Sequence, residues 1–515
     1  MSIPDTSRVA AALSTRHRWA CLVVLSASLL VIMMDITVLN VALPDLAAQL
    51  RPTANQQLWI VDAYSLALAG LLVPMSALAD RWGRKRLLLT GFTVFGGVSL
   101  LVLAAASPAA VIAVRALLGA GGAMIMPTTL SMIRSVFTDP RERATALGVW
   151  AAVSSLGMAV GPIVGGVLLE RFSWHAAFLV NVPLMVAALA AGLLLLPEVR
   201  APNPGRWDVV ATVLSVVGMA ALVWAIKRFA VEGAADPVAW TALPAALALL
   251  GWFVLRCLRR SDPLLDVRLF CRAPFTAGVV AALMSMFAMT AVLLLAVQWL
   301  QLVAGHSPLW SGVSLLPMAA AAALASPLAP ALAVRIGART VLAGGLAVAG
   351  VGFLVLYAAP GPLSSPAVLL SLVLLGAGSG ALAVASAIIM SGTPEAKAGN
   401  AAAIEETAYD IGSALGVAVL GSVAAAVYRA RLSTEALVGR GLLDADQARA
   451  AEESLGAALE IASRAGAAEL AARAGEAFTD SLTRTGLVGG LVMFAAAAVV
   501  FVLVPGDLDL AEQHH

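Results

Sequence analysis

The sequence predicts an all-α polytopic membrane protein with fourteen transmembrane helices. Of its 515 residues, 61% are hydrophobic and only 12% are charged. Soluble globular chains average about 45–50% apolar and about 25% charged residues. The apolar residues also fall into long runs, and a helix needs about 20 of them to cross a bilayer. This composition excludes a soluble enzyme.

The predicted spans are 19–43, 57–78, 87–106, 109–132, 144–169, 176–196, 209–226, 238–255, 275–301, 312–334, 341–359, 367–390, 399–427 and 486–504. The seventh and eighth are the weakest because they are short and adjoin charged segments. Basic residues precede the first run, as in a signal peptide. That run is too long for a signal peptide and contains Asp35, so we expect an uncleaved first span.

Lys and Arg are distributed asymmetrically between the loops. With the N-terminus in the cytoplasm, the inner loops hold most of the 32 basic residues. The short outer loops then hold only Arg51, Arg171, Lys227 and Arg228. The positive-inside rule therefore favours this orientation. An even number of spans returns the C-terminus to the cytoplasm too.

The spans suggest three parts: a six-helix bundle at 1–196, two additional linker helices at 197–273, and a second six-helix bundle at 274–515. The segments 76–85 and 328–339 form a faint repeat, and related halves are typical of secondary transporters. A polar outer insertion occupies 429–485. Its 444–474 part predicts one or two amphipathic helices capped at Asp444. These helices would pack on the outer rim or along the membrane surface. The alternative, which we prefer, is a solvated helical hairpin with no role in transport chemistry.

Three charged side chains are predicted at similar depth in the outer half of the first bundle. Their depth follows from their distance in sequence to the ends of their spans, because an α-helix rises about 1.5 Å per residue. They are Asp35, Asp62 and Arg115. A charge in a span costs roughly 2.5–3.5 kcal/mol on insertion scales, so it usually faces the bundle interior or a water-filled path. Arg115 needs a partner, and either carboxylate could provide it. The alternative is that Asp35 is merely satisfied by a neighbouring helix.

The thirteenth span contains a second acidic group, formed by Glu405, Glu406 and Asp410. Glu406 and Asp410 lie four residues apart and share a helix face. Glu405 points about 100° away from that face. No basic residue precedes Arg429 in this span, so the two carboxylates of the shared face should not both be ionised. Alternatively, Glu405 and Glu406 lie at the inner mouth in contact with water.

Aromatic and methionine side chains are candidates for the lining of a cavity near these acids, although each is more often a packing residue. They include Trp59, Tyr64, Met286, Trp299 and Tyr409. A cation on an aromatic face gains roughly 0.5–2 kcal/mol, and methionine adapts to varied shapes. Acidic groups in such a cavity favour lipophilic cations.

Two segments are candidates for conformational gates. Gly157, Gly161 and Gly165 recur every four residues, which leaves one helix face bare and permits a close approach that could slide. Pro162 weakens the same helix locally. In the inner loop that follows the second span, Gly83 permits a tight turn. The charged residues around it, Asp80, Arg81 and Arg84, could lock one conformation. Static packing and a purely topological role for the basic cluster are the alternatives.

These segments resemble the major facilitator superfamily, and within it the fourteen-helix drug–proton antiporters, which include quaternary-ammonium and multidrug efflux proteins. The resemblance covers nearly the whole chain. Four motifs carry it, at 35–44, 78–85, 115–122 and 157–166. Two departures are Ser76, where the family usually has Gly, and Leu118, which replaces a common Gln.

The resemblance implies two six-helix bundles plus two central helices, and proton-coupled export of lipophilic cationic drugs by alternating access. The cargo would include quaternary ammonium compounds, dyes and biguanide-like antiseptics. It implies no enzyme activity, metal, nucleic acid or cofactor, with the proton gradient as the energy source. The protein is expected to be a monomer in the bacterial plasma (inner) membrane. The alternatives are an exporter of one natural-product antibiotic, lipid or metabolite, and a receptor that transports nothing.

We assign the candidate residues to three roles on this basis. Proton coupling is expected of Asp35, Arg115, Glu406 and Asp410; cargo binding of Asp62, Trp59, Tyr64, Glu405, Tyr409, Met286 and Trp299; and gating of Asp80, Arg81, Gly83, Arg84, Gly157, Gly161, Pro162 and Gly165. No Walker-type phosphate loop is present in the sequence, so ATP drive is unsupported.

Overall fold

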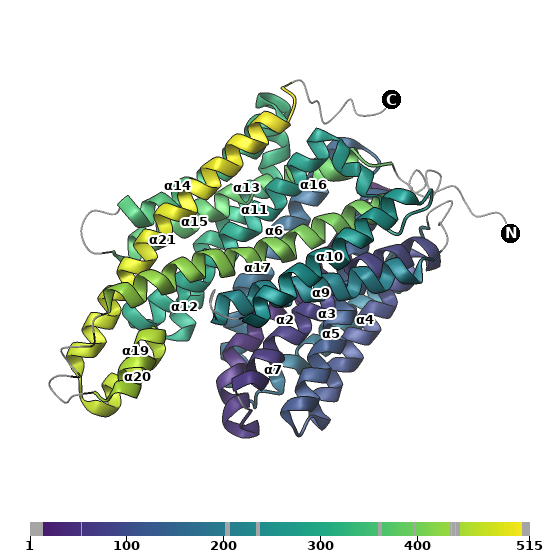
Figure 1. Cartoon of the computed structure of the whole chain (residues 1–515). Coiled ribbons are helices and arrows are strands. Elements are labelled where there is room, and N and C mark those ends of the chain that lie inside the picture. Colours follow the sequence, from purple (N-terminus) through teal and green to yellow (C-terminus); the bar gives the residue numbers. More distant parts are fainter. Residues whose placement is uncertain are drawn as a thin grey trace.

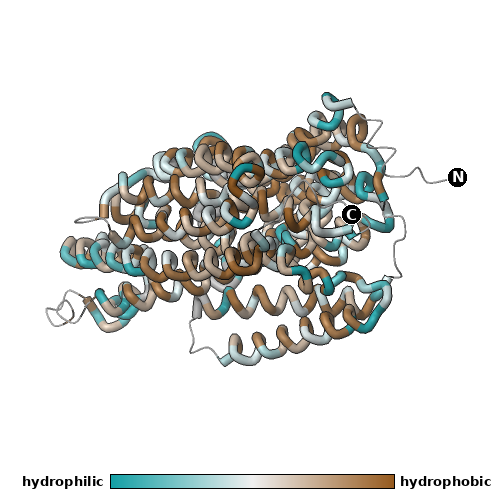
Figure 2. The backbone as a smooth tube through the Cα atoms, turned by 90° about the horizontal axis from the view of Figure 1, so that it is seen from above, coloured by the Kyte–Doolittle hydropathy of each residue, from teal (hydrophilic) through white to brown (hydrophobic). Residues whose placement is uncertain are grey.

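The computed structural model describes residues 14–52, 54–200, 207–232, 237–358, 363–394, 397–432, 434, 438 and 443–506. Within these ranges the regular structure is helical, and 14 helices are long and apolar enough to cross a membrane. The predicted all-α membrane fold is thus confirmed. Figure 2 shows hydrophobic residues along the middle of the helices and hydrophilic residues gathered toward their ends.

The first half of the chain contributes six spans and two short helical segments. They are α2 (Thr15–Leu50), α3 (Ala54–Trp82), α4 (Arg84–Leu101), η1 (Val102–Ala104), α5 (Pro108–Val136), α6 (Pro140–Leu169), α7 (Ala176–Leu179) and α8 (Asn181–Leu195). We call the end of the molecule where α2 begins and α3 ends the terminal end, and the opposite end the far end. Ser107 and Asp139 cap α5 and α6.

Two further spans, α9 (Val209–Glu232) and α10 (Pro237–Arg259), follow the first bundle and pack against each other. Helix α9 also contacts α3 and α17 (Ala398–Arg431), beside which it lies in Figure 1. The prediction that Lys227 and Arg228 belong to an outer loop is wrong, because α9 continues to Glu232.

The second half contains the remaining spans, several of them interrupted. They are α11 (Ala273–Gln298) with the π-helical η3 (Trp299–Val303), α12 (Pro308–Ser314) with α13 (Leu316–Ile336), α14 (Ala338–Ala358), α15 (Ser365–Gly378) with α16 (Ala381–Ser391), α17, and α21 (Ala468–Leu503). The short η2 (Val267–Cys271) precedes α11. The buried apolar residues form two large clusters, one mainly from each half.

The outer insertion forms α19 (Ala445–Glu453) and α20 (Leu455–Ala465), and Asp444 caps α19 as predicted. The prediction of a solvated hairpin is wrong, because these helices pack against the second half of the chain. Leu455 and Ala458 belong to the core cluster of the second half, and the Tyr428 hydroxyl of α17 donates to the Ala451 carbonyl at 3.1 Å. Helix α21 starts well before the predicted span, so the insertion continues directly into it (Figure 1).

Candidate transport site

A buried ion pair joins α2 to α5. Nη1 of Arg115 lies 2.7 Å from Oδ2 of Asp35, and both side chains are only 2% exposed. Nδ2 of Asn181 donates to Oδ1 of Asp35 at 2.6 Å. Nε of Arg115 donates to the Ile60 carbonyl at 3.2 Å, and its guanidinium lies 4.4 Å from the ring centroid of Tyr64. Both charges are therefore compensated inside the first bundle.

The sequence left open whether Asp35 or Asp62 pairs with Arg115, and the structure selects Asp35. Asp62 pairs instead with Lys227 of α9, and these side chains are 22% and 27% exposed. Two carboxylates at similar depth thus have different partners and different access to water. Sequence reasoning missed Lys227 because it treated that residue as part of a loop.

The acidic residues of α17 are unequally satisfied. Oε1 of Glu405 accepts hydrogen bonds from the Tyr409 hydroxyl, at 2.6 Å, and from the Ser386 hydroxyl. Glu406 is 0% exposed, and neither of its carboxylate oxygens accepts a hydrogen bond from any described residue. Oδ2 of Asp410 likewise has no described hydrogen-bond partner. Burying a carboxyl group without hydrogen-bond partners is costly, so Glu406 is the least satisfied acid of this helix.

These acids lie where the two halves of the chain meet. Ile404 and Ala408, which flank Glu405 and Glu406, belong to the core cluster of the first half, and α17 contacts both α3 and α5. Tyr64 of α3 is fully buried beneath Arg115 and interacts electrostatically with both Asp35 and Asp410. The predicted acidic groups of the two halves are therefore neighbours across this tyrosine.

The other predicted cargo-binding residues occupy different surroundings. Trp59 is 39% exposed on α3. Trp299 is 4% exposed, and its indole N–H donates to the Thr479 hydroxyl of α21 at 3.1 Å. Met286 packs against the core cluster of the second half. Of the predicted aromatic residues, Tyr64 and Tyr409 are the two that contact the charged groups directly.

At the terminal end, the predicted gate residues form a buried network. Nη2 of Arg84 lies 2.9 Å from Oδ1 of Asp80, and Nη1 donates to the Ser135 hydroxyl of α5 at 2.5 Å. The Ser76 hydroxyl of α3 donates to the Gly399 carbonyl of α17. A methyl group on Gly399 would lie 2.5 Å from Oδ2 of Asp80. The two halves are therefore in close contact at this end.

The inner-loop turn depends on Gly83, which has φ +116°. A methyl group there would lie 2.3 Å from Oε1 of Glu198.

Burial raises the pKa of Glu198, although Arg200 and Arg86 oppose this change. Arg81 is directed elsewhere, with its guanidinium 5.3 Å from the Trp207 ring centroid.

The glycine face of α6 packs on α2, inside the first bundle. Methyl groups on Gly157 and Gly161 would lie 2.8 Å from the Leu30 carbonyl oxygen and 1.9 Å from Oγ1 of Thr37. At Gly165 the closest atom would be a Val38 methyl at 3.4 Å. This face therefore sets the position of the helix that carries Asp35. Pro162 lies toward the second half instead, beside Gly312 of α12.

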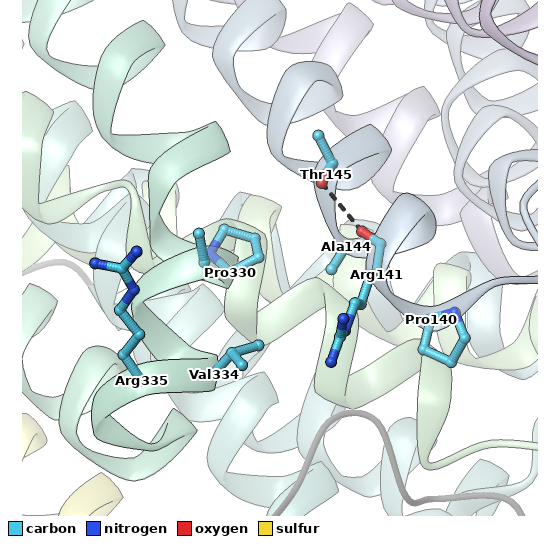
Figure 3. Close-up of a pocket in the computed structure, with 8 residues that line it drawn as sticks. Pro140, Arg141, Ala144, Thr145, Pro330, Val334 and Arg335 are labelled. Carbon is cyan, nitrogen blue, oxygen red and sulfur yellow. Dashed lines mark hydrogen bonds between the residues drawn. The ribbon is translucent and has the colours of Figure 1, made fainter.

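A separate cleft of about 300 Å³ lies between α6 and α13 near the terminal end (Figure 3). It is lined by Pro140, Arg141, Ala144, Thr145, Pro330, Ala331, Val334 and Arg335. Its charged residues are both arginines, so its electrostatics oppose a cationic ligand. The acids of α2, α3 and α17 do not line it.

A two-bundle helical protein with buried charges at its seam has the architecture of a membrane transporter. Residues 25–417 match the family model described as Major Facilitator Superfamily. The chain therefore belongs to the Major Facilitator Superfamily, and it is a multi-pass transporter and not an enzyme.

Curated relatives extend along nearly the whole chain. The multidrug efflux pump LfrA of Mycolicibacterium smegmatis is 41% identical over 501 residues, which are 96% of this chain and 97% of LfrA. The methyl viologen resistance protein SmvA of Salmonella typhimurium is 36% identical over 449 residues, which are 87% and 89% of the two chains. Among solved structures, the human organic anion transporter MFSD10 (TETRAN) aligns with a TM-score of 0.59 at 16% identity, over 92% of this chain and 99% of that one.

Proposed function

We propose that this protein is a proton-coupled antiporter that exports lipophilic cationic drugs by alternating access. The observation that carries the proposal is Glu406, a fully buried acid at the seam of the two halves whose oxygens no described residue satisfies. Such a group is stable as a neutral acid while buried and can ionise once water reaches it. A carrier that opens alternately to the two sides would expose Glu406 to different proton concentrations.

The charges around the seam support a cationic cargo. Asp62 is 22% exposed and pairs with Lys227, which also interacts electrostatically with Asp410, whereas Arg115 is neutralised by Asp35. The aromatic ring of Tyr64 lies at this region, against Arg115. In this proposal Glu406 and Asp410, together with the Asp35–Arg115 pair, couple protons, while Asp62 and the aromatic residues recognise the cargo.

The names of the relatives agree with such a cargo. LfrA is a multidrug efflux pump, and SmvA confers resistance to methyl viologen, an aromatic dication. The terminal end would face the cytoplasm in the bacterial inner membrane, with both chain termini on that side. Protons entering from the far end would protonate the acids, displace the cargo outward and return the carrier. The protein would act as a monomer and use no cofactor besides the proton gradient.

Purified protein in proteoliposomes with an imposed pH gradient tests this function. Ethidium and methyl viologen should accumulate against their gradients only on the side that supplies protons, and nigericin, which collapses the pH gradient, should abolish the accumulation. Cargo movement that is indifferent to the pH gradient would contradict proton coupling. Transport of one compound from a broad panel would favour a dedicated exporter instead.

A further inference from the structure

Helix α9, one of the two helices beyond the twelve of the paired bundles, closes the side of the molecule where α3 meets α17. A third, smaller apolar cluster joins these helices and consists of Leu66, Ala69, Val223, Ile226, Ala414 and Ala418. The approach is close, since a methyl group on Gly70 of α3 would lie 3.1 Å from the Val216 carbonyl oxygen of α9. Helix α9 therefore reaches the same seam as the acids of α3 and α17.

One turn beyond Val223, α9 places a cation against these acids. The ammonium group of Lys227 pairs with Oδ1 of Asp62 and interacts electrostatically with Asp410 of α17. The neighbouring Arg228 points elsewhere, with its guanidinium 5.5 Å from the ring centroid of Trp224. Lys227 is thus a cation supplied by the chain itself at the carboxylate that we assign to cargo.

The Lys227–Asp62 pair differs from the Asp35–Arg115 pair in its exposure. About a quarter of each side chain is accessible in the first pair, compared with 2% in the second. A partly accessible pair contributes little net energy, so a competing cation can replace one partner at low cost. Lysine suits such an exchange, because its ammonium group is carried on a flexible stem of four carbons. A buried Arg pair, in contrast, loses several kcal/mol when one partner leaves.

We propose that Lys227 is a tethered counter-ion that occupies Asp62 in the empty carrier and is displaced by cationic cargo. This inference rests on the proposed function, because it assumes a cation as cargo. Lys227 keeps the acids compensated when no cargo is bound. It also sets a threshold, since a cation enters only if its charge and apolar surface outcompete an ammonium group already in place. In this role α9 acts as a specificity element.

Binding of ethidium to the purified full-length protein tests the competition. Lys227→Met should tighten the Kd for ethidium by about twofold to fivefold, since a partly exposed pair of this kind is worth up to about 1 kcal/mol. Arg228→Met, which removes the same charge from the next residue, should leave the Kd unchanged. A neutral dye should bind equally to all three proteins. Equal effects of the two substitutions, or weaker binding of ethidium by Lys227→Met, would overturn the proposal.

A second measurement needs no destabilising substitution. The sequence contains only three lysines, Lys85, Lys227 and Lys397, so reductive ¹³C-methylation yields few signals, and Lys227→Arg identifies the relevant one. Saturating ethidium should shift the Lys227 signal and leave the other two in place. An unmoved Lys227 signal in a protein that binds ethidium would overturn the inference alone. A wild-type protein that binds no cation would instead overturn the proposed function.

Discussion

Asp35 of α2 and Arg115 of α5 form an ion pair of 2.7 Å from which solvent is almost excluded. Asn181 donates a further hydrogen bond to Asp35, and Arg115 donates one to the Ile60 carbonyl. Removing either partner would leave the other charge buried and uncompensated. Tyr64 also interacts electrostatically with Asp410 of α17, and on that helix neither oxygen of Glu406 accepts a hydrogen bond from any described residue. The seam therefore combines one compensated charge pair with a buried acid, Glu406, that lacks a described hydrogen-bond partner.

Removing one partner of the fixed pair should be worse than removing both. Arg115→Leu leaves a buried carboxylate uncompensated and should lower the free energy of unfolding by roughly 3–5 kcal/mol. Asp35→Leu combined with Arg115→Leu should recover most of the thermal stability. Both variants should lose proton-driven efflux. Thermal unfolding in detergent and dye efflux from cells measure the two effects, and full efflux by the double variant would show that the pair is only structural.

The glycine face of α6 offers a matched pair of substitutions. Gly161→Ala would place a methyl group 1.9 Å from Oγ1 of Thr37, whereas at Gly166 nothing lies within 4 Å. Gly161→Ala should therefore destabilise the protein by about 1–3 kcal/mol through overpacking and displace α2 with Asp35. Gly166→Ala should be neutral in both unfolding and efflux assays. Equal behaviour of the two variants would exclude a role for this close approach.

The contact at the terminal end can be tested on α17. Gly399→Ala would force a methyl group to 2.5 Å from Oδ2 of Asp80, while Gly421 of the same helix has open space. Gly399→Ala should shift the carrier toward states in which α3 and α17 separate at this end. Distances between spin labels on Trp82 and Lys397 should then become longer. Gly421→Ala serves as the control, and an unchanged distance in Gly399→Ala would show that this contact is no gate.

Asp62 and the α17 pair should differ in their dependence on cargo charge. Asp62→Asn removes one carboxylate contact, so it should weaken transport of divalent cations by about twofold to fivefold more than that of matched monovalent cations. Glu406→Gln combined with Asp410→Asn should impair every cargo and shift the pH optimum. Transport of paired monovalent and divalent compounds distinguishes the two roles. An equal loss of both classes in Asp62→Asn would mean that the acids are interchangeable.

Much of the fold follows from hydropathy alone, because a bilayer demands long apolar helices whatever their packing. The 14 spans were predicted on that basis. The helix ends that consist of polar residues were not predicted, because the apolar segment is shorter than the helix that contains it. This explains why α9 continues through Lys227 and why α21 begins within the insertion.

The site was predictable in its acidic residues but not in its pairings. Axial depth placed Asp35, Asp62 and Arg115 at one level, yet it carries no information about which helix faces which. That choice depends on tertiary packing, such as the close contact of α5 with Tyr64 at Gly119. Ser386, which donates to Glu405, had no sequence signal, since serine is common in membrane helices. The contact of Asn181 with Asp35 likewise required the structure.

The most direct test of proton coupling measures proton movement and cargo movement in the same vesicle. Proteoliposomes that contain the protein and the pH dye pyranine, without an imposed gradient, should change their internal pH when ethidium is added outside. The wild-type protein should move protons opposite to ethidium, and Glu406→Gln, which cannot ionise, should lose this exchange while still inserting and binding dye. Ethidium transport without any proton movement in the wild type, or undiminished exchange in Glu406→Gln, would contradict the account.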